Sequence, residues 1–115
     1  FLKTDSISYP IKEFLEKINA DFILIFGSFA QGKYNSDSDI DLLIIGKATQ
    51  QEVFKLLKPV EKLIKREINP VIWTLQELKK NKGKGFVKDI LKKNKIMIKG
   101  DENEFKRIIE WEKNR

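Results

Sequence analysis

The sequence contains no cysteine and no histidine. Without cysteine the chain can form neither disulfides nor thiolate metal sites, and without histidine it lacks the usual imidazole base and zinc ligand. It also lacks an apolar run of about 18 residues, so we expect no membrane-spanning segment. No export signal is recognisable, and the cytoplasm is the default location. Any chemistry must therefore use carboxylates, lysines, hydroxyl groups or a bound metal.

The length of 115 residues and the hydrophobic content of 41% predict one domain, residues 1–115, with a modest core. The first residue is Phe1, whereas an initiator methionine is normally removed only before small residues. We therefore expect the chain to be a fragment of a longer protein.

The net charge of +6 is concentrated in the second half of the chain. Residues 1–49 hold five lysines and seven acids, while residues 50–115 hold eighteen basic residues and ten acids. The run from Lys79 to Lys99 has nine lysines and one acid, Asp89. This pattern suits a polyanionic partner such as a nucleotide triphosphate or nucleic acid, but a coding bias toward lysine or a solvated surface would give the same composition.

Apolar runs and helical periodicity alternate along the chain. Strands are predicted at 21–26, 40–45, 67–73 and 95–99, with the third at an edge because Pro70 cannot donate to a ladder. Helices are predicted from Pro10, from Thr49 to Lys65, from the Thr74 cap, from Phe86 and from the Asp101 cap. We expect Pro59 to kink or split the second of these helices. The order predicts an α/β (α+β) fold, a small mixed sheet with helices packed on it.

Acidic residues precede the second apolar strand. Asp39 and Asp41 are two positions apart and share one face of the strand, whereas Asp37 lies before it. Two carboxylates so close repel each other, and a divalent cation would relieve the repulsion. Ligands that are all oxygen favour Mg²⁺ or Mn²⁺. The alternative is an exposed strand start with solubilising acids.

A glycine closes the strand before this one. Gly27 and Ser28 follow the apolar run, and "FAQG" predicts a short helical turn whose backbone N–H groups and serine hydroxyl can hold phosphate oxygens. Gln31 and Lys33 could also touch phosphate or face solvent. Phosphate-binding and metal-binding residues would then be about ten positions apart on neighbouring strands.

The stretch "FGSFAQGKYNSDSDIDLLIIG", residues 26–46, resembles the signature of the DNA polymerase β-type nucleotidyltransferase superfamily, particularly its minimal domains. The later stretch "FVKDILKKNKIMIKGDENEF" is similar to the C-terminal part of prokaryotic and archaeal members in which the domain follows a DNA-binding helix-turn-helix. The resemblance implies that Gly27 and Ser28 bind nucleotide phosphates and that Asp39 and Asp41 hold Mg²⁺. Lys33, from its place in the spacer, is also predicted to bind the nucleotide. The resemblance also implies transfer of a nucleotidyl group, most plausibly AMP from ATP, to acceptors that include a partner toxin protein.

Members of that superfamily usually carry a third acid on the next core strand, where it completes the metal site and helps to activate the acceptor. Glu67 is the only acid in the third predicted strand and is assigned this catalytic and metal-binding role. Asn69 shares its face and is a poorer metal ligand. If Glu67 points to solvent, the alternative is a nucleotide-sensing or docking module of a DNA-binding regulator.

Overall fold

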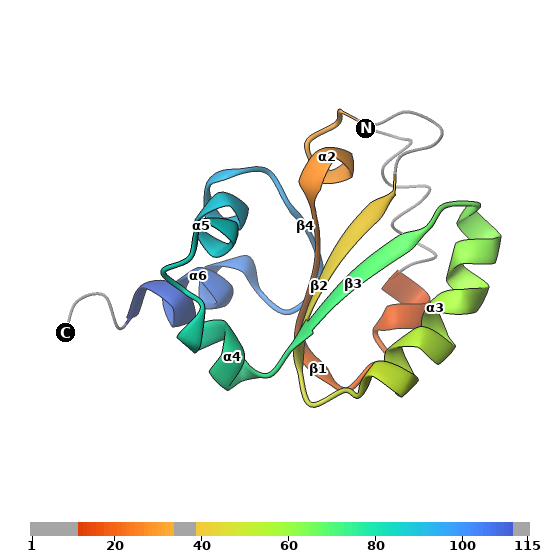
Figure 1. Cartoon of the computed structure of the whole chain (residues 1–115), viewed down its shortest axis with the longest axis horizontal. Coiled ribbons are helices and arrows are strands. Elements are labelled where there is room, and N and C mark those ends of the chain that lie inside the picture. The colour runs from red at the N-terminus through yellow and green to blue at the C-terminus, as the bar shows by residue number, and fades with distance from the viewer. Residues whose placement is uncertain (1–11, 34–38, 112–115) are drawn as a thin grey trace.

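The computed structural model describes residues 12–33 and 39–111 and is built around one mixed β-sheet (Figure 1). Its strands are β1 (Ala20–Phe26), β2 (Ile40–Gly46), β3 (Ile68–Trp73) and β4 (Ile96–Lys99), in the order β3-β2-β1-β4. β1 is antiparallel to β2 and to β4, whereas β2 and β3 are parallel. The predicted mixed sheet is confirmed, and β3 lies at an edge as Pro70 indicated.

Helices cover both faces of the sheet (Figure 1). They are α2 (Gly27–Ala30), α3 (Gln50–Ile64), α4 (Leu75–Lys80), α5 (Gly85–Lys92) and α6 (Glu102–Trp111); residues 12–15 are also helical. Alternate residues of β1 enter different cores: Ile23 and Ile25 pack with α3, while Phe22 and Leu24 pack with α4, α5 and α6. This two-sided burial explains why β1 and β2 are continuously apolar. None of these helices is long and apolar enough to cross a membrane.

The helix α3 runs without interruption through Pro59. Thr49 caps its start, where the hydroxyl oxygen accepts a hydrogen bond from the N–H of Glu52 at 3.2 Å, and Lys65 ends it in a left-handed conformation. The expectation that Pro59 splits this helix is therefore wrong. Pro59 is on the exposed side, and burial of the opposite side, through Val53 and other apolar residues, stabilises the helix despite the lost backbone hydrogen bond.

Replacing Pro59 by alanine should stabilise the domain. Alanine restores a backbone N–H and removes the proline ring from the exposed face of α3, so we expect a gain of about 1 kcal/mol in the free energy of unfolding. Urea unfolding measures it, with the neighbouring exposed Lys58→Ala as control. A lower stability for Pro59→Ala than for Lys58→Ala would show that the proline contributes more by restricting the unfolded chain than it costs the helix.

Candidate active site

The C-terminal end of β1 and the N-terminal end of β2 lie side by side at one end of the sheet, where α2 begins. Phe26, the last residue of β1, lies opposite Asp41 in the antiparallel register. The next residue, Gly27, has φ 79° and opens α2. A Cβ at Gly27 would collide with Oδ2 of Asp41. The glycine therefore permits both the left-handed turn and the close approach of the carboxylate to the backbone.

The short helix α2 is anchored on one side and exposed on the other. Phe29 is fully buried in the core beneath α3, whereas Ser28 is exposed. Past the helix, Gly32 has φ 75° and its N–H donates to the Phe29 carbonyl at 3.2 Å, while the N–H of Lys33 donates to the Ser28 carbonyl at 2.9 Å. These two bonds close a left-handed C-cap. The backbone thus brings Ser28 and Lys33 together, next to Gly27 and Asp41.

Three polar residues share the sheet face covered by α4, α5 and α6. Asp41 is half-buried and aligned with Asn69 of β3 in the parallel register. The amide Nδ2 of Asn69 donates to Oδ2 of Asp39, which is exposed, at 3.3 Å. Burial raises the pKa of Asp41, a hydrogen bond from Asn69 lowers it, and the neighbouring Asp39 charge raises it, with a net upward shift. The two carboxylates are therefore a like-charge pair held together by an amide.

Glu67 is exposed and lies one residue before β3. Its carbonyl oxygen accepts the N–H of Ile40 at 2.9 Å, which continues the β2–β3 pairing and aligns Glu67 with Asp39. Among residues 12–33 and 39–111, no group of three acidic side chains is placed to hold a metal ion. The metal-binding role of Glu67 stays a prediction, and Asp37 lies outside the described residues.

The Asp39–Asp41 pair fits a hard divalent cation. Its donors are all oxygen, and a cation between the carboxylates would offset the repulsion that contributes to the raised pKa of Asp41. Mg²⁺ in phosphate-handling sites is commonly held by one or two carboxylates plus substrate phosphates. Two acids beside a glycine turn suit that arrangement better than an all-protein cage.

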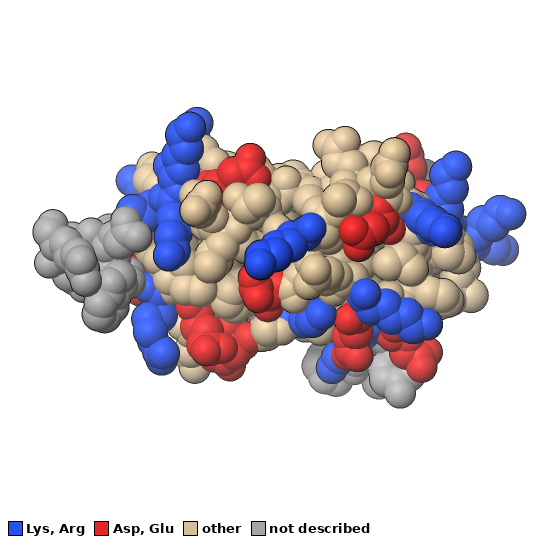
Figure 2. All heavy atoms as spheres, turned by 90° about the horizontal axis from the view of Figure 1, so that it is seen from below, with Lys and Arg blue, Asp and Glu red and all other residues tan. Residues whose placement is uncertain are grey.

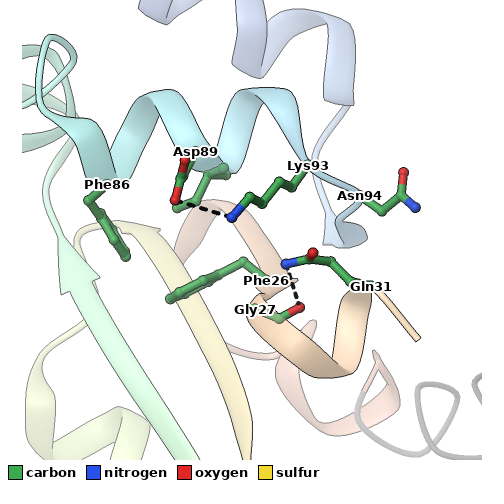
Figure 3. A pocket seen from close by; sticks show the side chains of 8 residues that line it. Phe26, Gly27, Gln31, Phe86, Asp89, Lys93 and Asn94 are labelled. Atoms are coloured by element: carbon green, nitrogen blue, oxygen red, sulfur yellow. Dashed lines mark hydrogen bonds and ion pairs between the residues drawn. The ribbon is translucent and has the colours of Figure 1, made fainter. Parts of the chain in front are cut away.

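A pocket of about 210 Å³ adjoins the same turn, between α2 and α5 (Figure 3). It is lined by Phe26, Gly27, Gln31, Phe86, Asp89, Ile90, Lys93 and Asn94. Phe26 and Phe86 meet edge to face, with ring centroids 5.1 Å apart. This pocket was not predicted from the sequence, because its walls come from segments about 60 residues apart and Phe86 was predicted only as the start of a helix.

The lysine-rich segment 79–99 is partly engaged within the fold. Lys93 pairs with Asp89 at 3.4 Å, and Lys95, whose side chain is 3% exposed, pairs with Glu102 at 3.2 Å. Lys99 donates to main-chain carbonyl oxygens in the N-terminal segment. On the face drawn in Figure 2, acidic and basic side chains are interspersed. These contacts explain part of the positive charge without a nucleic-acid partner.

The chain belongs to the Polymerase beta nucleotidyltransferase family, whose model matches residues 10–103. It is 27% identical over 93 residues to a candidate protein adenylyltransferase of Methanocaldococcus jannaschii, MJ0604, covering 76% of this chain and 93% of that protein. A second such protein from the same organism, MJ0141, is 39% identical over 56 residues, which span 42% of this chain and 57% of the relative. The chain is thus a nucleotidyltransferase with adenylyltransferase relatives.

Solved structures share the fold at low sequence identity. A toxin–antitoxin complex with AMP-PNP superposes with a TM-score of 0.62 at 15% identity, over 89% of this chain and 80% of that one. The tri-AMPylated Shewanella oneidensis HEPN toxin in complex with the MNT antitoxin gives a TM-score of 0.55 at 11% identity, over 98% and 82%. These likenesses confirm the nucleotidyltransferase-like fold.

Two glycine variants can separate backbone strain from the contact with Asp41. Gly27→Ala and Gly32→Ala impose a side chain at nearly the same positive φ, but only the first places a Cβ against Asp41; the Cβ at Gly32 meets nothing within 4 Å. We expect each to lose about 1 kcal/mol of stability from strain and Gly27→Ala to lose about 1 kcal/mol more. Urea unfolding measures both. The excess should shrink in the double variant Gly27→Ala/Asp41→Ala, and an unchanged excess would contradict the contact.

Asp41→Asn should stabilise the metal-free protein at neutral pH. Because the folded state raises the pKa of Asp41 above its ordinary value of 3.8, folding favours the protonated form. That contribution is present below pH 3.8 and is lost as pH rises through the raised pKa. The advantage of Asp41→Asn should therefore appear above that range, reaching about 0.5 kcal/mol because solvent screens a half-exposed group. Urea unfolding in a chelator, with exposed Asp21→Asn as control, measures it; a pH-independent difference would contradict the cause.

Proposed function

We propose that this domain transfers AMP from ATP to a protein acceptor with Mg²⁺ as cofactor. The observation that carries the proposal is the placement of Asp41 against the Gly27 turn, with Asp39 two positions away on the same face of the sheet. Family membership supports nucleotidyl transfer, and the adenylyltransferase relatives support AMP as the group transferred. The toxin–antitoxin complexes that share the fold, one of them holding an AMPylated toxin, support a protein as the acceptor.

In this proposal each part of the site has a distinct task. Ser28, the backbone at Gly27 and Lys33 hold the β- and γ-phosphates, while Asp39 and Asp41 hold the cation. When bound, Mg²⁺ neutralises triphosphate charge and polarises the α-phosphate. An oxygen of the acceptor forms a bond to the α-phosphorus, the bond from that phosphorus to the oxygen bridging to the β-phosphate breaks, and pyrophosphate leaves. Glu67, aligned with Asp39, accepts the proton of the attacking hydroxyl.

The second candidate function is nucleotide sensing or docking without turnover. It is favoured by one observation: within the described ranges, no third carboxylate joins Asp39 and Asp41, and the neighbouring position on β3 is Asn69.

A nucleic-acid partner, through segment 79–99 or through a helix-turn-helix in a longer chain, finds no support in the relatives. Binding of nucleic acid would weaken steeply as the salt concentration rises, whereas binding of a protein acceptor need not depend on salt in this way.

Thermal unfolding with Mg²⁺ and each of ATP, GTP, CTP and UTP tests the nucleotide site. ATP should raise the melting temperature, since a ligand at 100 times its Kd stabilises the folded state by about 2.7 kcal/mol. Asp39→Ala and Asp41→Ala should lose this response. Asp21→Ala, an exposed aspartate at the other end of β1, is the matched control and should keep it. A full response in Asp39→Ala/Asp41→Ala would refute the site.

Turnover is tested with ATP labelled at the α-phosphate and candidate partner proteins. We expect label on the partner and release of pyrophosphate, with at least a hundredfold loss in the Asp39→Ala/Asp41→Ala variant, because that variant removes the cation's ligands. Glu67→Gln should retain ATP binding and lose most transfer. ATP binding without pyrophosphate release across all acceptors would favour the sensing function.

A further inference from the structure

The pocket between α2 and α5 shares Gly27 with the proposed phosphate site. Phe26, one of its walls, lies opposite Asp41 in the sheet, and Gly27, which also lines it, is the residue against which Asp41 packs. The pocket and the carboxylates are therefore on the same face of the sheet, separated by the width of one strand. A molecule whose phosphates lie at Gly27 and Ser28 can extend into the pocket.

The size of the pocket limits what can enter it. Its volume is about 210 Å³, whereas pockets that enclose a whole small-molecule ligand typically measure about 300–1,000 Å³. A complete nucleoside triphosphate does not fit inside. One end of the nucleotide fits, and its phosphates must then remain outside, toward Ser28, Asp39 and Asp41, which do not line the pocket.

The walls combine aromatic rings with a hydrogen-bonding pair. Phe86 is 37% exposed, although it contacts Phe26 at 5.1 Å and Trp73 at 5.7 Å between ring centroids, so part of its ring is free to stack. Above the rings, Lys93 reaches back toward Asp89 within hydrogen-bonding distance, 3.4 Å (Figure 3). Both side chains are more than half exposed, at 53% and 65%, so they can turn toward a ligand.

The chemistry of these walls matches a nucleobase. Bases stack on aromatic side chains through their π-faces, and such stacking is a large part of single-strand recognition. Adenine presents an amine donor beside a ring-nitrogen acceptor. A carboxylate beside an ammonium group is complementary to that pair, since Asp89 accepts from the amine and Lys93 donates to the ring nitrogen.

We propose that this pocket receives the adenine base of the nucleotide, with Phe86 as its stacking surface and Asp89 and Lys93 as its polar contacts. The proposal rests on the nucleotidyl-transfer function above and adds to it the residues that select the base. It assigns α5, which lies outside the signature stretch of residues 26–46, a direct part in substrate recognition.

Calorimetry with ATP, GTP and inorganic tripolyphosphate, each with Mg²⁺, separates base from phosphate binding. Phe86→Ala should weaken ATP binding about tenfold and leave tripolyphosphate binding unchanged. Phe86→Tyr should retain ATP affinity because it keeps the ring. Phe54→Ala, which removes an aromatic ring 48% exposed on α3, is the matched control and should change neither affinity.

Asp89→Asn keeps the shape of the side chain and remains informative if Phe86→Ala fails to fold. It should reduce the preference for ATP over GTP several-fold, while Glu16→Gln, which alters a similar exposed pair with Lys12, should not. ATP binding unaffected by both Phe86→Ala and Asp89→Asn, or equal weakening of ATP and tripolyphosphate, would overturn the base pocket. Equal affinity for ATP and GTP would overturn the assignment to adenine.

The outcomes also distinguish the two proposals. ATP binding that depends on Phe86 but persists in Asp39→Ala/Asp41→Ala would support the base pocket and refute the proposed function. ATP binding that depends on Asp39 and Asp41 but not on Phe86 would support the proposed function and refute the base pocket. Absence of ATP binding by the unaltered chain would overturn both.

Discussion

The antiparallel pairing of β1 with β2 is the constraint on which the site depends. Its register sets Phe26 opposite Asp41 and so places the Gly27 turn against a carboxylate. Side chains alternate along a strand, so a shift of one residue would move Asp41 to the opposite face and bury a charge beneath α3. The apolar residues that follow Asp41 resist such a shift because both faces of the sheet are covered. Core packing and site geometry are thus stabilised by the same pairing.

The site places two like charges at the end of an apolar sheet, and the fold limits the unfavourable free energy of their repulsion and burial. Asp39 remains exposed, Asp41 is only half-buried, and the Asn69 amide bridges to the outer carboxylate. An amide in this place donates a hydrogen bond when no cation is present, whereas a third carboxylate would add repulsion. The arrangement therefore favours a fold that is stable without a bound cation.

Much of the fold could be predicted, because strands buried on both faces read as apolar runs and caps such as Thr49 and Thr74 have local signatures. The predicted split at Pro59 does not occur, because packing of the opposite face of α3 outweighs a local propensity. At the site, the motif of residues 26–46 predicted that Gly27 and Asp41 lie close together on neighbouring strands. The alignment of Asn69 with Asp41 and the pocket wall at Phe86 could not be predicted, since register and helix packing depend on contacts distant in sequence.

The strand order β3-β2-β1-β4 also has a consequence for how the chain folds during synthesis. The strands that carry the acids and the glycine turn are complete by residue 73, while β4 is made last and pairs along the free side of β1. Until β4 leaves the ribosome, β1 is an apolar edge strand with unpaired backbone groups, which invites pairing with other chains. When β4 pairs with β1, it satisfies these backbone groups and so protects the newly made chain from such pairing.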